Sequence, residues 1–280
     1  MSQQNFFNQL VKKEIKSNFQ IFATPDFLEQ NLSANLENVK FFQELINEVA
    51  KVKIDYPKNR KLKVSMVVIP RDLYAEISGN PFGQGINAGP NPYDEVFKFA
   101  IYIDDISFLQ RRDWSRIDIL HEISHVVHGA FFRGIGPFGE GFAEALPLYI
   151  MDLEKDSPNH IQKICEMKPD DFLSLTQIMK RGMNPESEIK QNLPIALRKS
   201  YIVIYLITRG ILQRLVLRNG GDKAAALNEF LRKFHDFQPL ADEMKLHDEL
   251  IFKFAGLSES EGWKTLQAEA QSEICEAQRS

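Results

Sequence analysis

His121-Glu122-Ile123-Ser124-His125 is the stretch of this 280-residue chain that constrains the structure most strongly. On a helix, two residues four positions apart lie on the same face, so His121 and His125 can aim two imidazoles at one metal ion. Apolar or small residues recur around the segment at helical spacing, and one stripe of them consists of Ile117, Leu120, Ser124 and Val127. The sequence therefore predicts a buried helix over about residues 113–131 that carries two metal-ligating histidines.

Glu122 lies beside the histidine pair and adds a carboxylate to it. Neutral imidazole nitrogen is a good zinc ligand, and a catalytic zinc ion takes three protein ligands and keeps a fourth position for water. That water needs a base, and a glutamate within this pattern can supply it. We therefore expect one Zn²⁺ per chain, with His121 and His125 as ligands and Glu122 as the general base.

The third zinc ligand must come from outside this pair, and the candidates that follow it are His128, Glu140 and Glu144. His128 lies one turn further along the helix, but three ligands on one straight helix converge poorly on a tetrahedral ion. A metzincin site would need glycine at position 128 and histidine at position 131, where this chain has His128 and Phe131. A carboxylate remains, either Glu140 or Glu144, on a second helix after the glycine-rich turn at residues 134–139.

The segment Gly139-Glu140-Gly141-Phe142-Ala143-Glu144 resembles a phrase of the gluzincins, the HExxH peptidases whose third ligand is a glutamate. Their M1-aminopeptidase-like members carry that ligand in Asn-Glu-Gly-Phe-Ala, and the chain looks closest to the small proteins described as peptidase MA-like. Matching the phrase implies that Glu140 is the third ligand and that Glu144 lies behind it. The family's separation of eighteen residues after the second histidine instead selects Glu144, because only fourteen residues separate His125 from Glu140.

The resemblance covers roughly residues 17–268, although only the site motifs are specific. It implies a zinc-dependent metallopeptidase, a hydrolase that cleaves peptide bonds in a peptide or protein substrate. It also implies a downstream tyrosine or histidine that stabilises the oxyanion, and the candidates are Tyr201 and Tyr205, in an apolar helix where core packing is the commoner role. The alternative is a non-proteolytic zinc-binding or ligand-binding protein on the same scaffold.

The order of the predicted elements gives an α+β, zincin-like fold with a small, mainly antiparallel sheet in its N-terminal part. Thr24-Pro25 is typical of a helix start, and helical apolar spacing continues over residues 25–52. Residues 61–69 and 96–103 alternate as strands, and the unpaired edge of the second strand suits an extended peptide. Four glycines and three prolines predict a loop at residues 78–92.

After the second strand, helical patterns fill the rest of the chain. They cover about residues 113–131, 138–153, 158–167, 170–181, 194–218 and 222–235. We therefore expect three parts, which are an N-terminal extension at 1–18, an α/β zincin subdomain at 19–135 that ends in the HExxH helix, and a C-terminal helical subdomain at 136–280 that carries the third ligand.

Composition and charge limit the kinds of partner and the location that we expect for this protein. The formal net charge is −4, from 34 basic and 38 acidic residues, so no basic excess recruits nucleic acid. The N-terminus is too polar for a secretory signal, and charges interrupt the most apolar later stretch, so we expect no membrane span and a cytoplasmic location. Cys165 and Cys275 lack metal-ligand spacing and suit a reducing compartment, with a single bridge between them as the alternative.

Overall fold

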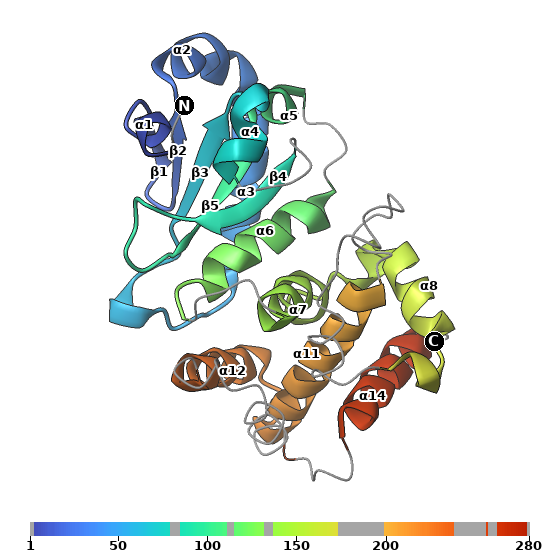
Figure 1. Ribbon diagram of the computed structural model, residues 1–280. Helices are drawn as coiled ribbons and strands as arrows, with labels where there is room; N and C mark the ends of the chain where they lie inside the picture. Colours follow the sequence, from blue (N-terminus) through green and yellow to red (C-terminus); the bar gives the residue numbers. More distant parts are fainter. Residues whose placement is uncertain are drawn as a thin grey trace. The chain divides into compact units, whose positions relative to one another are not determined.

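The computed structural model describes residues 3–78, 85–110, 115–131, 137–172, 199–237, 256 and 262–278. The chain divides into two compact units, Met1–Arg133 and Gly134–Ser280 (Figure 1). This division falls two residues before the predicted boundary between residues 135 and 136. One five-stranded sheet with packed helices lies in the first unit, and the described part of the second unit is helical, which confirms the α+β class.

The sheet is mixed rather than mainly antiparallel. Its strands are β1 (Val11–Lys16), β2 (Phe19–Ala23), β3 (Val64–Ile69), β4 (Ile86–Pro90) and β5 (Phe99–Asp104), in the spatial order β1-β2-β3-β5-β4. The β2–β3 and β3–β5 pairs are parallel, whereas the two outer pairs, β1–β2 and β5–β4, are antiparallel. Every residue of β3 and β5 is buried, as expected for central strands that are covered on both faces.

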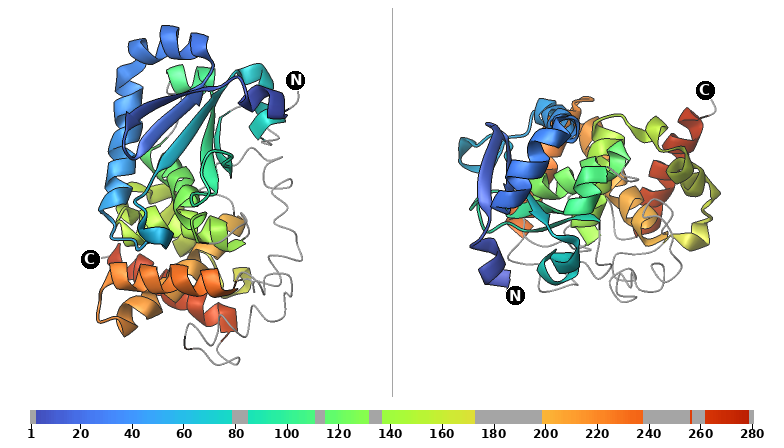
Figure 2. Two further views of the ribbon diagram at one scale, coloured as in Figure 1. Left: turned by 90° about the vertical axis from the view of Figure 1, so that its left-hand side faces the viewer. Right: turned by 90° about the horizontal axis from the view of Figure 1, so that it is seen from above.

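Helices cover both faces of this sheet, as the two views of Figure 2 show. On one face, α1 (Gln3–Phe7) and α4 (Arg71–Ser78) pack over a cluster that comprises Phe6, Phe22, Val67, Ile69, Tyr74, Ile77, Ala100 and Tyr102. On the other face, α3 (Leu36–Lys51) packs beside α6 (Arg116–His128), and α6 contacts β4 and β5. The HExxH helix is therefore positioned against the sheet of its own unit.

Two predictions about the strands need correction. The segment at 1–18, predicted as an extension, contains β1, which pairs with β2 as an edge of the sheet. The segment at 78–92, predicted as a loop, contains the opposite edge strand β4. Because β5 pairs with β3 and with β4, the edge on this side of the sheet belongs, among the described strands, to β4 and not to the predicted strand at residues 96–103.

The predicted helix start at Thr24-Pro25 is confirmed. The Thr24 hydroxyl accepts a hydrogen bond from the Phe27 backbone N–H at 3.4 Å, and Pro25 occupies the first helical position of α2 (Pro25–Phe27). Short π-helical and 3₁₀ segments then lead into α3, so helical structure extends to Lys51. The short helix α5 (Asp105–Gln110), which follows β5 directly, was not predicted.

In the second unit, the long helix α11 contacts each of the other four described helices of at least eight residues. The described α-helices of this unit are α7 (Pro137–Ala145), α8 (Pro158–Glu166), α11 (Lys199–Arg218), α12 (Lys223–Phe237) and α14 (Gly262–Ala277), and α11 packs most extensively against α7, α12 and α14. Most of the predicted helix at 170–181 lies outside the described residues. No helix in the described part of the chain is both long and apolar enough to cross a membrane.

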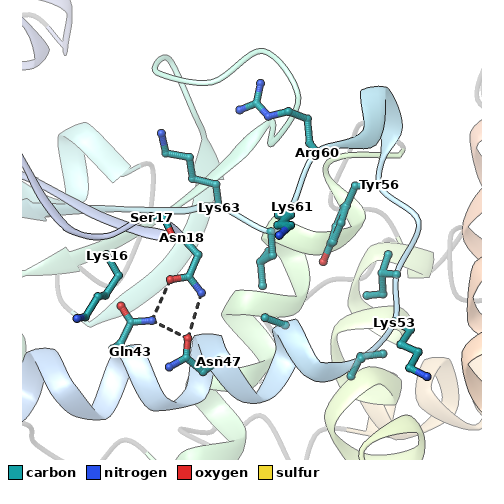
Figure 3. Close-up of a pocket in the computed structure, with 14 residues that line it drawn as sticks. Lys16, Ser17, Asn18, Gln43, Asn47, Lys53, Tyr56, Arg60, Lys61 and Lys63 are labelled. Carbon is teal, nitrogen blue, oxygen red and sulfur yellow. Dashed lines mark hydrogen bonds between the residues drawn. The ribbon is translucent and has the colours of Figure 1, made fainter.

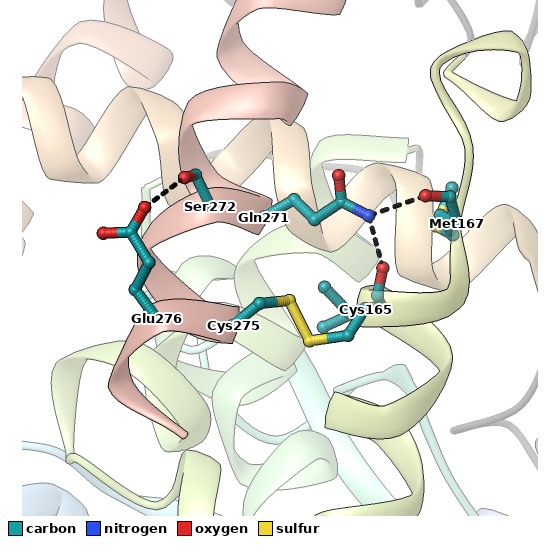
Figure 4. The surroundings of a disulfide bond; sticks show 7 residues. Cys165, Met167, Gln271, Ser272, Cys275 and Glu276 are labelled. Carbon is teal, nitrogen blue, oxygen red and sulfur yellow. Dashed lines mark hydrogen bonds between the residues drawn. A yellow bond between two sulfur atoms is a disulfide. The ribbon is translucent and has the colours of Figure 1, made fainter. Parts of the chain in front are cut away.

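A disulfide between Cys165 and Cys275 joins α8 to α14 in this unit, with the two Cα atoms 5.8 Å apart (Figure 4). The amide of Gln271 on α14 donates hydrogen bonds to the carbonyls of Ile164 (2.6 Å) and Met167 (2.9 Å) at the end of α8. The single bridge named as the alternative for these cysteines is therefore the arrangement observed.

Candidate metal centre

The helix α6 begins at a complete capping box. Ser115 Oγ accepts a hydrogen bond from the Asp118 backbone N–H at 3.1 Å, and the Asp118 carboxylate accepts one from the Ser115 backbone N–H at 2.9 Å. This exchange satisfies exposed donors of the first turn and defines where the helix starts. From Ile119 to His128 every residue of α6 is buried. The predicted buried helix is confirmed, with the HExxH segment at its middle.

The two histidines of this segment meet on one face of α6, as predicted. The Nε2 atoms of His121 and His125 lie 3.1 Å apart, and both side chains are buried. Two nitrogens that bind one tetrahedral zinc ion at their usual bond lengths would lie about 3.3 Å apart. The observed separation is close to that value, so the pair fits a shared cation.

A third side chain completes a possible metal-binding group. His121, His125 and Glu140 are all buried, and each offers a ligand atom within 4.8 Å of the other two. Glu140 lies in the first turn of α7. Glu144, one turn later, is also buried but does not belong to this group among the residues that the structure describes. Two imidazoles and a carboxylate are a donor set that suits a catalytic zinc ion.

His128 has a role that the sequence did not reveal. Its Nε2 atom lies 2.8 Å from Nδ1 of His125, and its ring packs edge-on against Phe99 with the centroids 5.3 Å apart. If His125 donates its Nδ1–H to His128, the lone pair on His125 Nε2 stays available for a metal. His128 is therefore not a member of the candidate metal-binding group but contacts His125, which is.

Glu122 is bound to the free edge of the sheet. Its Oε2 atom accepts a hydrogen bond from the backbone N–H of Ala88 on β4 at 2.6 Å. At the two ends of β4, the carbonyl of Gly85 accepts a hydrogen bond from the N–H of Asp104, and the N–H of Asn91 donates one to the carbonyl of Lys98. Because successive residues of an antiparallel strand alternate in direction, the N–H of Ala88 points away from β5. The carboxylate of Glu122 thus lies at the open edge of β4.

Tyr205 takes part in a buried polar network within the second unit. Its hydroxyl donates to Glu154 Oε1 at 2.5 Å, and Arg209 Nε donates to the same oxygen at 2.7 Å. Burial, and then the charge of Glu154, raises the pKa of Tyr205 well above its usual value, so the hydroxyl stays protonated. Tyr201, one turn earlier on α11, is only partly buried.

Comparison of this chain with protein-family models and with curated proteins finds no match.

Proposed function

We propose that this protein is a zinc-dependent metallopeptidase of the gluzincin type, with a zincin-like first unit. The observation that carries the proposal is the buried group of His121, His125 and Glu140, next to a glutamate that follows the first histidine directly. A buried set of two imidazoles and a carboxylate is costly to maintain unless it binds a cation. The resemblance of residues 139–144 to the gluzincin phrase supports the same assignment.

In this proposal His121, His125 and Glu140 hold the ion, and Glu122 moves the proton. A bound zinc ion would polarise the substrate carbonyl and lower the pKa of an attacking water. Glu122 accepts the proton of that water and later delivers it to the leaving amine. The hydrogen bond from Ala88 supports this role, because it restrains the carboxylate next to the histidine pair.

The free edge of β4 supports a peptide as the substrate. An extended peptide can pair with the outward main-chain groups of an edge strand, and this pairing does not depend on its side chains. The outward N–H of Ala88 is already bound to Glu122, so a peptide would pair with the other outward main-chain groups of β4 and would pass close to the general base. We therefore propose strand addition to β4 rather than to β5.

The second candidate function is a zinc-binding or ligand-binding protein without peptidase activity. The observation that favours it is the bond of the Tyr205 hydroxyl to Glu154, which commits one of the two candidate oxyanion donors to another partner. Under the first proposal, Tyr201 would then be the remaining tyrosine candidate. Both candidate functions are compatible with the cytoplasmic location that we propose from the sequence.

Metal analysis together with paired variants tests the proposal. We expect one zinc per chain, and the Glu122→Gln variant should keep its zinc but lose hydrolysis of a mixed peptide library by at least a thousandfold. Glu140→Ala should lose zinc, whereas Glu144→Ala, as the matched control one turn away, should retain most of it. Stoichiometric zinc without cleavage by the wild type would support the second candidate. A metal-free wild type in zinc-containing medium would contradict the peptidase proposal and a zinc-binding role.

A further inference from the structure

A cavity in the first unit is lined by residues that the proposed peptidase site does not use. It has a volume of about 820 Å³ and is bordered by the second half of α3, the turn that joins β1 to β2, and the segment that leads from α3 to β3 (Figure 3). Its lining includes Lys16, Gln43, Tyr56, Arg60, Lys61 and Lys63. Ligand pockets for small molecules have volumes of this order.

The charge of this lining has one sign. Five of its residues are lysine or arginine, and none is acidic. Arg60 forms an ion pair with Asp94 at 3.1 Å. Among the described residues, no ion pair involves Lys16, Lys61 or Lys63. The local bias is also clear in the sequence, because residues 51–63 contain six basic side chains and a single acidic one. This concavity concentrates positive charge in a chain that is acidic overall.

Two buried polar atoms among these residues lack a hydrogen-bond partner. The amide nitrogen of Gln43 donates to Asn18 (3.0 Å) and Asn47 (2.9 Å), but its Oε1 atom accepts nothing. The hydroxyl of Tyr56 is also without a partner, and both side chains are only 8% exposed. Buried polar groups are nearly always satisfied, so two such atoms at one cavity point to a ligand that supplies the missing bonds.

We propose that this cavity binds a small organic phosphate, a compound with one or more phosphate groups on an apolar or aromatic body. The lysines supply point charges for the phosphate, and the Tyr56 hydroxyl, which burial keeps protonated by raising its pKa, supplies a neutral donor. The apolar members of the lining, among them Val52, Ile54 and Leu62, form a surface for the body of the ligand. The site is independent of the metal centre.

Calorimetric titration of the whole protein at low ionic strength tests this proposal. The probes are adenosine diphosphate, inorganic pyrophosphate and adenosine, which separate the phosphates from the aromatic body. We expect adenosine diphosphate to bind most tightly and adenosine least. The double variant Lys61→Gln/Lys63→Gln should weaken adenosine diphosphate by at least about tenfold, because each lysine contributes a charge-assisted contact.

Two further variants keep the test specific. Tyr56→Phe preserves the ring and should weaken adenosine diphosphate several-fold. Lys12→Gln/Lys13→Gln removes the same charge from exposed positions on β1 outside the cavity and should change binding less than twofold. Absence of binding, equal weakening by both lysine pairs, or binding that survives Lys61→Gln/Lys63→Gln, as expected for an anion held at the metal centre, would overturn the proposal. The proposal would also be overturned if a hexaglutamate peptide displaced adenosine diphosphate at a concentration lower than that of adenosine diphosphate.

Discussion

At the scale of single residues, His125 contacts a second histidine at each of its two ring nitrogens, an arrangement that bears on its proposed role as a metal ligand. Its Nε2 atom faces His121 and its Nδ1 atom faces His128, so both nitrogens of the ring are in contact with another imidazole. A metal-ligating histidine usually donates its second N–H to a carboxylate or a carbonyl, and here a buried histidine takes that place. In the proposed zinc site, His128 would therefore fix the orientation of His125 without binding the ion itself.

We therefore predict that His128→Phe lowers zinc affinity by about ten- to a hundredfold, because His125 loses the acceptor that orients it. The aromatic ring should keep its packing against Phe99, so the melting temperature should change little. Competition with a chromogenic chelator measures the affinity. His128→Gln restores an acceptor and should recover part of it. Equal zinc affinity in wild type and His128→Phe would show that the contact has no positioning role.

At the scale of elements, the carboxylate of Asp104 joins four segments at the end of β5. It accepts hydrogen bonds from the backbone N–H of Gly85 (2.7 Å), the hydroxyl and N–H of Ser107 (2.6 and 2.8 Å), and Nε of Arg71 (3.0 Å). Burial alone would raise the pKa of Asp104, but these bonds outweigh it and lower that pKa. The ionised form therefore stabilises the start of β4, the end of β5, α4 and α5 together.

Asp104→Asn should reduce the free energy of unfolding at pH 7 by about 2–4 kcal/mol, since the amide cannot replace a carboxylate that accepts four bonds. Because the folded pKa is lowered, this stabilisation is complete above the unfolded pKa of about 3.9 and is lost as the pH falls through the folded value. Denaturant titrations between pH 3 and pH 7 measure the difference, with exposed Asp72→Asn as the control. A difference that stays constant with pH would contradict this account.

The contact between α7 and α11 depends on the absence of a side chain at Gly141. A Cβ atom there would lie 2.1 Å from Thr208 Oγ1 and 2.7 Å from Ile204 Cγ2. We expect Gly141→Ala to destabilise the protein by about 1–3 kcal/mol through overpacking. Adding Thr208→Ala should recover part of that loss, measured against Thr208→Ala alone. Additive effects of the two changes would mean that the helices separate instead of clashing at this point.

The elements that the sequence predicted and those that it missed differ in their local signals. The HExxH helix and the helix start at Thr24-Pro25 follow from apolar spacing and capping residues within one segment. The edge strand β4 contains Gly89 and Pro90, so its composition indicates a loop, and only pairing with β5 makes it a strand. Likewise, the contacts of Glu122 with Ala88 and of His128 with His125 depend on tertiary packing or on side-chain orientation, which no residue pattern encodes.

At the scale of the whole molecule, the disulfide and the predicted location bear on each other. The Cys165–Cys275 bond closes a loop across a sequence separation of 110 residues. It links α8, which follows α7 in the chain, to α14, the last of the described helices. Such bonds form and persist in oxidising compartments, whereas cytoplasmic thiols are usually kept reduced. A cytoplasmic location therefore predicts two thiols in the cell, although the folded chain holds the sulfurs within bonding distance.

Reduction should destabilise the second unit in particular. For a loop of this length, loss of the bond is expected to lower the free energy of unfolding by about 2–5 kcal/mol, because the unfolded chain gains conformational freedom. Fluorescence of Trp263, which is buried on α14, reports the transition in a Trp114→Phe background, and Cys165→Ser/Cys275→Ser should match the reduced protein. Alkylation of free thiols at the moment of cell lysis then decides the compartment. Two alkylated cysteines fit the cytoplasm, whereas a protected, oxidised pair would show that the prediction of a cytoplasmic location is wrong.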